Sequence, residues 1–313
     1  MAPSVAHTIK SLTREHLEQR GGLLFGQAVT AVGWVNNTVP DCPGIVEFPM
    51  SDVSNMGIAC GAALAGVRPI IVVRFQDFMW LNGSPLVNYA AKAREIFNQP
   101  VPVFVRALAQ EHAGCTHSGV LHGLFMHMPG IRICCPMTSG EYREIWADFL
   151  AHDDPVYVSE HRTSFAFEGE FETTDHPADV TLVGISAARF NLAGAVERLA
   201  GRGVTCNVAH VHRLKPLRID HAIRALDRSR LGLVVDAGYT TCGASQSVAY
   251  QLMLACGKPV HALGLEDRSV GVGPAHRNPT PSAERIAQTV LTLLKAPASF
   301  DRFDSDASLE VAP

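Results

Sequence analysis

The sequence lacks several features that mark large functional classes. No apolar run approaches the roughly 20 residues that cross a bilayer, and the opening residues lack the apolar stretch of a secretory signal. No basic block stands out either, since 26 Lys and Arg face 30 Asp and Glu, for a formal net charge of −4. These absences argue against a membrane protein and against a nucleic-acid partner. We therefore expect a cytoplasmic protein that acts on a small molecule.

Common nucleotide-binding and hydrolase motifs are also missing. The chain contains no GxGxxG fingerprint, no GxxxxGK(S/T) phosphate loop and no GxSxG elbow. Its eight cysteines include no CxxC pair, which predicts free thiols in a reducing compartment. The adjacent Cys134 and Cys135 lie in an apolar run, where we expect them to act as small strand residues rather than as a redox pair.

The chain does have ample material for a core. Of its 313 residues, 47% are apolar and 18% are charged, which suits one or two globular domains. Short β-branched runs alternate with helical patterns, as in βαβ units with mostly parallel sheets. Strands are predicted at 70–75, 101–106, 131–135, 156–160, 180–185, 204–211, 233–236 and 260–263. Helices are predicted at 54–66, 85–97, 140–152, 192–200, 219–228, 244–255 and 282–294.

A polar, turn-rich stretch at 161–179 separates two such series. The sequence therefore predicts an α/β protein with two doubly wound domains, at residues 1–165 and 179–296. The remainder, 297–313, shows no sustained period and is predicted to be a flexible tail.

Residues that follow strands are the first candidates for chemistry, because a doubly wound sheet binds ligands at the carboxyl ends of its strands. Glu47 and Asp52 lie in a loop that opens a helix of small residues, although Asp52 or Ser54 could equally be a helix N-cap. The segment 74–80 runs from a buried strand into an aromatic cluster. Such a cluster suits a flat heterocyclic ligand or, just as well, the core.

Four histidines recur at intervals of five residues: His112, His117, His122 and His127. On a helix each step turns by roughly 140°, so the four side chains would not share a face. The acidic partners typical of a zinc motif are also missing. We therefore expect no metal site on this chain.

Taken together and in order, these segments resemble the β subunit of the first component of 2-oxo acid dehydrogenase complexes, and more distantly the C-terminal half of transketolases. The resemblance runs from about residue 23 to 294. It rests on FPMSD at 48–52, GIACGAALAGVRP at 57–69, RFQDF at 74–78, NYAAK at 88–92, THS at 116–118, HMPG at 127–130, DVTLV at 179–183 and LKPL at 214–217. It implies a pyrimidine-binding domain for thiamine diphosphate, followed by a transketolase C-terminal-type domain.

The resemblance also assigns roles to individual residues. Asp52 matches the carboxylate that bonds to the pyrimidine ring nitrogen, and Phe78, with Trp80 nearby, matches the ring that stacks on the pyrimidine. His117 matches the histidine that faces the thiazole and the substrate, while His112 is a weaker candidate for substrate contact. Relatives carry glutamate in place of Asp52. The shorter side chain implies a closer backbone, a bridging water or impaired activation.

The family's motif for the diphosphate and magnesium, GDG with a downstream Asn, does not occur in the chain. In two-chain members this motif belongs to the α subunit. The resemblance thus implies an α-type partner that holds most of the magnesium contacts, and assembly to α2β2. With that partner the enzyme would decarboxylate a 2-oxo acid or cleave a ketose and transfer the acyl or two-carbon unit. The alternatives are the C-terminal subunit of a split transketolase or carboligase, and a non-catalytic subunit that keeps the fold.

Overall fold

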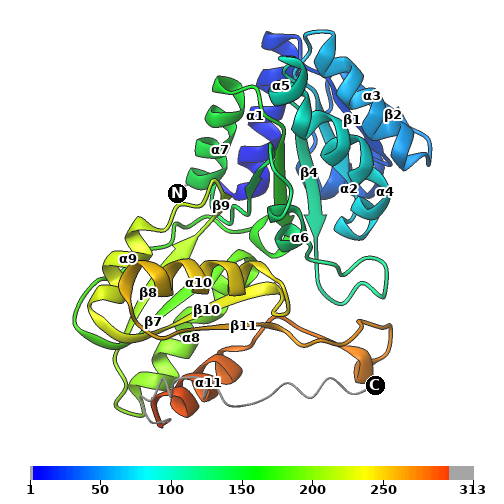
Figure 1. Ribbon diagram of the computed structural model, residues 1–313. Helices are drawn as coiled ribbons and strands as arrows, with labels where there is room; N and C mark the ends of the chain where they lie inside the picture. Colours follow the sequence, from blue (N-terminus) through cyan, green and yellow to red (C-terminus); the bar gives the residue numbers. More distant parts are fainter. Residues whose placement is uncertain (1–2, 296–313) are drawn as a thin grey trace, which may run out of the picture.

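Two β-sheets organise residues 3–295, the part of the chain that the computed structural model describes (Figure 1). The first has seven strands in the order β2-β1-β3-β4-β6-β5-β9, and the second has four in the order β11-β10-β7-β8. Helices flank both sheets, so the predicted α/β class with two doubly wound units is confirmed. The predicted tail at 297–313 lies outside the described residues.

The first sheet is parallel except at one edge. Its strands are β1 (Leu24–Gln27), β2 (Ile45–Phe48), β3 (Ile70–Val73), β4 (Phe104–Ala109), β5 (Arg132–Cys134), β6 (Val156–His161) and β9 (Arg213–Lys215). Strand β9 pairs antiparallel with β5, although it comes from a later part of the chain, beyond the first strands of the second sheet. The helical segments here are α1 (Val5–Arg20), α2 (Ala31–Asn37), α3 (Asp52–Leu64), η1 (Gln76–Phe78), α4 (Met79–Pro85), η2 (Leu86–Ala90), α5 (Ala91–Phe97), α6 (His122–Met126), α7 (Ser139–Ala151) and η3 (Arg162–Ser164).

Strand β3 is apolar throughout because its side chains alternate between two faces of the sheet that are both buried. All four of its residues are at most 4% exposed. Ile71 and Val73 belong to one hydrophobic cluster, and Ile70 and Val72 belong to another on the opposite face. A central strand covered on both faces needs apolar side chains at every position, which is how the sequence signalled it.

The second sheet is wholly parallel, with strands β7 (Ala178–Ile185), β8 (Cys206–Val211), β10 (Ser229–Tyr239) and β11 (Val260–Leu265). Its helical segments are η4 (Ser186–Ala188), α8 (Arg189–Ala200), α9 (Asp220–Asp227), α10 (Ala244–Cys256), η5 (Pro274–His276) and α11 (Ala283–Lys295). One face packs against α8 and α11 in a cluster of its own. The other face, with α9 and α10, shares a single hydrophobic cluster with the first unit. The two units are therefore joined through buried apolar surface.

Two sequence motifs meet in the first unit at a position that only glycine can occupy. Gly130 closes the HMPG turn with a φ of 72°, and a Cβ there would lie 1.7 Å from the carbonyl oxygen of Ala91. Ala91 belongs to the NYAAK segment. The close approach of the two backbones explains why glycine stands at position 130.

Several elements differ from the prediction. The strand predicted at 101–106 lies at 104–109, since Pro102 has no N–H to donate to a sheet and the ladder begins only after it. The helix predicted at 85–97 begins already at residue 79 and contains a π-helical turn. Strands β1, β2 and β9 and helices α1, α2 and α6 were not predicted.

Candidate functional site

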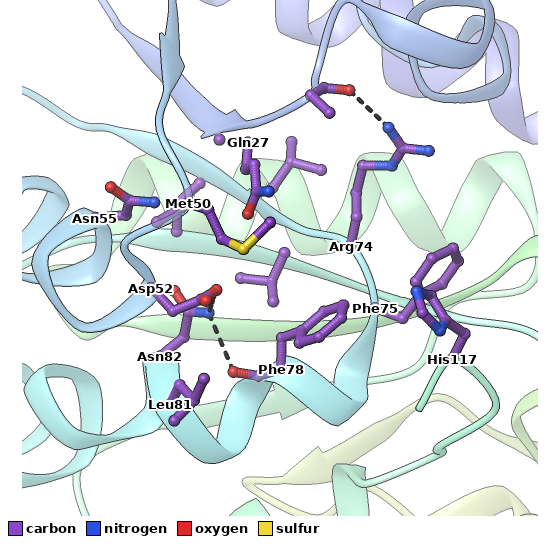
Figure 2. Close-up of a pocket in the computed structure, with 15 residues that line it drawn as sticks. Gln27, Met50, Asp52, Asn55, Arg74, Phe75, Phe78, Leu81, Asn82 and His117 are labelled. Carbon is purple, nitrogen blue, oxygen red and sulfur yellow. Dashed lines mark hydrogen bonds between the residues drawn. The ribbon is translucent and has the colours of Figure 1, made fainter. Parts of the chain in front are cut away.

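A cavity of about 410 Å³ lies at the carboxyl ends of β1 and β3 (Figure 2). Three of the residues predicted to form the site, Asp52, Phe78 and His117, all line it. The other lining side chains include Gln27, Met50, Asn55, Arg74, Phe75, Leu81 and Asn82. This is the edge at which parallel α/β sheets bind ligands.

Asp52 is the first residue of α3 and presents its carboxylate to the cavity. The interpretation of Asp52 or Ser54 as the N-cap is wrong, because Ser51 occupies that position and Ser54 lies within the helix. Asn82 of α4 donates from Nδ2 to Asp52 Oδ1 at 2.6 Å and to the carbonyl oxygen of Phe78 at 3.1 Å. Asn82 is only 2% exposed, so it holds the carboxylate in one orientation. The second oxygen, Oδ2, has no hydrogen-bond partner among residues 3–295 and remains able to accept from a ligand.

Phe78 and His117 form an aromatic wall of the cavity with Phe75. The His117 ring packs edge-on against Phe78, with centroids 5.4 Å apart, and against Phe75 at 4.8 Å. Thr116 Oγ1 lies 2.9 Å from His117 Nδ1 and engages that nitrogen. The other ring nitrogen, Nε2, has no partner in the described part of the chain and is the one that a ligand could use.

The loop that carries His117 is bound to η1, which carries Phe78. Asp77 Oδ2 accepts from the backbone N–H of Gly119 at 2.9 Å, and Gln76 Oε1 accepts from that of Leu121 at 2.6 Å. Gln76 is fully buried, and its Nε2 donates to the carbonyl oxygen of Ala107 and to Ser159 Oγ. One short segment, anchored by the buried Gln76, thus sets the positions of the Phe78 and His117 rings.

The remaining carboxylate of the first candidate loop is engaged elsewhere. Glu47 accepts hydrogen bonds from the N–H and the hydroxyl of Thr30, at 3.1 and 3.0 Å. It does not line the cavity. Asp52 is the carboxylate that this cavity offers to a ligand.

Two of the predicted site residues lie outside the cavity. Trp80 is 67% exposed and lines a separate cavity of about 350 Å³, together with Asp236 and Tyr239 of the second unit. His112 Nε2 lies 3.5 Å from Glu111 Oε2, and His112 borders neither of these two cavities.

The third histidine in the series has a structural environment of its own. His122 is fully buried, with Nε2 2.9 Å from Asp236 Oδ2 and Nδ1 3.2 Å from Ser159 Oγ. It therefore links the two units rather than facing a ligand. Within residues 3–295, no cluster of three or more His, Cys, Asp or Glu is arranged to hold a metal ion.

The eight cysteines are all free, as predicted. Cys134 and Cys135 are both buried, at 2% and 0% exposure. Burial raises the pKa of the Cys134 thiol to about 12 and that of Cys135 well above its usual value. Both side chains therefore stay protonated and act as apolar residues, as the sequence indicated.

Sequence reasoning missed Arg74 and Asn82. Arg74 belonged to a recognised segment but received no role, although its place directly after a buried strand was the signal that could have identified it. Asn82 lies 30 residues from Asp52 along the chain, and no pattern announced their contact.

Two family models match the chain. A transketolase pyrimidine-binding domain matches residues 22–166, and a transketolase C-terminal domain matches residues 169–286. Among the described residues, no helix is long and apolar enough to span a membrane.

Three named relatives each share less than 30% sequence identity with this chain. The β subunit of acetoin:2,6-dichlorophenolindophenol oxidoreductase from Cupriavidus necator is 28% identical, over 66% of this chain and 66% of that one. Its Bacillus subtilis counterpart is 26% identical, over 81% and 80%. The human mitochondrial pyruvate dehydrogenase E1 β subunit is 24% identical, over 67% and 64%. The chain thus spans about two thirds of the length of the first and third of these relatives.

Solved structures share the fold. A split-gene transketolase, described as an inactive beta4 tetramer, has a TM-score of 0.72 at 16% identity and covers 94% of this chain and 99% of that one. Transketolase from Campylobacter jejuni has a TM-score of 0.70 at 15% identity, covering 93% of this chain and 47% of that one.

Proposed function

This chain belongs to the transketolase-like family of thiamine diphosphate enzymes, with the β subunits of 2-oxo acid and acetoin dehydrogenases, and on that premise we propose that it supplies half of an active site. The proposed reaction is decarboxylation of a 2-oxo acid and transfer of the resulting acyl or two-carbon unit. The observation that carries the proposal is the meeting of Asp52, Phe78 and His117 around one cavity.

The cavity's side chains suit the pyrimidine half of thiamine diphosphate. Asp52 Oδ2 is free to hold a proton at a ring nitrogen, because Asn82 already occupies Oδ1. Phe78, Met50 and Leu81 offer apolar surface to a flat ring. When bound, the cofactor supplies a carbon nucleophile that adds to the substrate carbonyl.

His117 then has a different task from Asp52. Its Nε2 can donate or accept a proton at the oxygen of the reacting carbonyl. The bonds from Gln76 and Asp77 to the His117 loop restrict the movement of the imidazole, which favours a fixed geometry during the reaction.

A partner chain is needed for the rest of the cofactor. The sequence contains no GDG motif, and the described residues offer no metal-binding cluster. We propose that an α-type subunit holds the diphosphate and magnesium. Exposed apolar side chains around the cavity mouth support a docking surface there, with Met50 81%, Val53 53% and Leu81 52% exposed. Assembly to α2β2 and a cytoplasmic location remain our predictions.

The predicted domain division at 1–165 and 179–296 also remains our proposal. The separate sheets support it, with strand β9 as the exception, since it crosses to the first sheet. A non-catalytic role is less well supported, because a retained carboxylate with one oxygen held and one free is what proton chemistry requires.

Calorimetry on the purified chain tests the requirement for a partner. We expect thiamine diphosphate with magnesium to bind the chain alone weakly or not at all, and to bind tightly after addition of an α-type chain that carries GDG. The matched control is the α-type chain alone. Micromolar, magnesium-dependent binding to this chain without its partner would contradict the proposal.

A further inference from the structure

Arg74 reaches the cavity from the end of β3 with most of its hydrogen-bonding capacity unused. Nη1 donates to the carbonyl oxygen of Ala28 at 2.6 Å. Nε is buried without an acceptor, whereas Nη2 has no partner among residues 3–295 and is not buried. A guanidinium carries five N–H donors in a fork that matches carboxylate, sulfonate and phosphate oxygens.

The charge of Arg74 is also left without a counterion. Within the described chain, neither Arg74 nor the neighbouring Arg162 has a carboxylate oxygen within 4.0 Å. Arg106, in contrast, is fully buried and pairs with Glu160 at 2.8 Å. Burial, together with the positive charge of Arg162, lowers the pKa of Arg74, and Glu47 opposes this only as a smaller influence.

Topology explains how the positive charges gather. Arg74 follows β3 and Arg162 follows β6, on either side of β4 in the sheet. Gln110, which follows β4, accepts from Arg162 Nη1. Because these strands are parallel, their carboxyl ends place both guanidinium groups along the edge that borders the cavity.

The position of Arg74 relative to the other site residues limits what it can bind. Figure 2 shows Asp52 and His117 on opposite sides of the Phe78 ring, while the Arg74 side chain extends away from both toward the carbonyl oxygen of Ala28. If the Asp52 end takes the pyrimidine, then Arg74 borders the space left for the substrate. Arg74 would then be available to a part of the substrate that does not contact the pyrimidine.

We propose that Arg74 is a specificity-determining residue that binds a second, non-reacting anionic group of the substrate. The substrate class is then a short 2-oxo acid with an additional carboxylate, sulfonate or phosphonate. This inference rests on the proposed function and narrows its substrate.

The chemistry of decarboxylation explains why the bound group is not the departing carboxylate. As CO₂ leaves, the departing carboxylate loses its negative charge. A guanidinium paired with it would stabilise the ground state more than the transition state and slow the reaction. A charge that persists through the reaction, in contrast, can be held equally in both states and contributes binding and selectivity.

The test uses the chain assembled with its α-type partner, thiamine diphosphate and magnesium. The substrates are 2-oxobutanoate, which carries no second charge, and 2-oxoglutarate, 3-sulfopyruvate and 3-phosphonopyruvate, which distinguish the three anionic groups. We expect kcat/KM for at least one acidic substrate to exceed that for 2-oxobutanoate by about 100-fold or more. Arg74→Met should lower that value about 30- to 1,000-fold and change 2-oxobutanoate less than about threefold.

Two variants serve as controls. Arg74→Lys keeps the charge without the planar fork and should fall between wild type and Arg74→Met. Arg198→Met removes an exposed arginine on α8 in the second unit and should leave both substrate classes unchanged. An equal loss of kcat/KM for charged and uncharged substrates in Arg74→Met, with a lower melting temperature, would mean that Arg74 only holds the Ala28 backbone in place. That result would overturn the proposal.

Calorimetry with malonate, sulfoacetate and phosphonoacetate gives a second readout that needs no turnover. At least one should bind the assembled wild type and bind Arg74→Met tenfold or more weakly, while cofactor affinity stays within a few-fold. Failure of all three to bind the wild type would overturn the proposal, as would loss of the cofactor in Arg74→Met. Anion binding without turnover of any 2-oxo acid would instead count against the proposed function and support the anion site.

Discussion

Replacing Asp52 with asparagine tests the proposed chemistry with the smallest change in shape. An asparagine can still turn its carbonyl oxygen toward Asn82 Nδ2, which now lies 2.6 Å from Asp52 Oδ1. Its amide nitrogen then takes the place of Oδ2 and faces the cavity as a donor. The side chain stays in position, but it can no longer accept a proton or a hydrogen bond from the ligand.

The expected loss of rate follows from the replacement of a hydrogen-bond acceptor by a donor. Removal of one positioned acid–base group typically costs about 10²- to 10⁴-fold in rate. This corresponds to about 3–5 kcal/mol in activation free energy. Stability should change by about 1 kcal/mol or less, because the bond to Asn82 persists and only its acceptor becomes neutral.

The assay is deuterium exchange at C2 of the cofactor thiazolium, followed by NMR after acid quench in the assembled complex. Asp52→Asn should slow the exchange by the stated factor while the melting temperature stays close to that of wild type. Asp153→Asn is the matched control, because its carboxylate is half exposed in an ion pair with Arg68 and neither residue lines the cavity. Wild-type exchange in Asp52→Asn would refute the reasoning, because Asp52 is the carboxylate that this cavity offers to a ligand.

His117→Ala in the assembled enzyme should leave cofactor affinity within a few-fold of wild type and lower the single-turnover rate strongly, because Nε2 serves the substrate and not the diphosphate. Turnover close to wild type would exclude His117 from catalysis. Asp52→Glu restores the side-chain length found in relatives. A faster exchange at the cofactor C2 would show that the short carboxylate limits activation, whereas a slower exchange would show that the backbone is adapted to aspartate. Stability should decrease below pH 6.5, because burial lowers the pKa of His161 to about 4 in the folded chain while the unfolded chain protonates near 6.5. Between pH 7 and pH 5 this difference in pKa lowers the free energy of unfolding by about 2 kcal/mol. In urea unfolding, the free energy of His161→Gln should depend less steeply on pH than that of wild type. An unchanged pH dependence would contradict the assignment to His161.

Elements whose burial is complete could be read from the sequence. Strands β3 and β7 appear as largely apolar runs because helices cover both of their faces. Strand β9 has only three residues, Arg213–Lys215, and exists because β5 offers it a partner. Helix α1 was missed because its apolar residues are diluted by a polar face, although Ser4 caps its start and Gly21 its end.

The site shows the same division between local and non-local information. Asp52, Phe78 and His117 each lie in a recognisable local segment, and the structure brings all three to one cavity. The contact between Asp52 and Asn82 depends on how α3 packs against α4, which no spacing along the chain encodes. Trp80 follows Phe78 by two residues, but the turn of the helix that begins at Met79 points it elsewhere.

Strand β9 has a consequence for anyone who divides this protein. Ile133 of β5 pairs with Lys215, and the backbone N–H of Cys135 donates to the carbonyl oxygen of His212 at 2.8 Å. Lys215 Nζ also donates to the carbonyl oxygen of Met126 at 2.9 Å. A fragment that ends near residue 165 would lose these contacts and leave the edge of β5 open to pairing with other molecules. Expression of the first unit by itself should therefore yield aggregates, and a soluble fragment would have to carry a substitute for the donated strand.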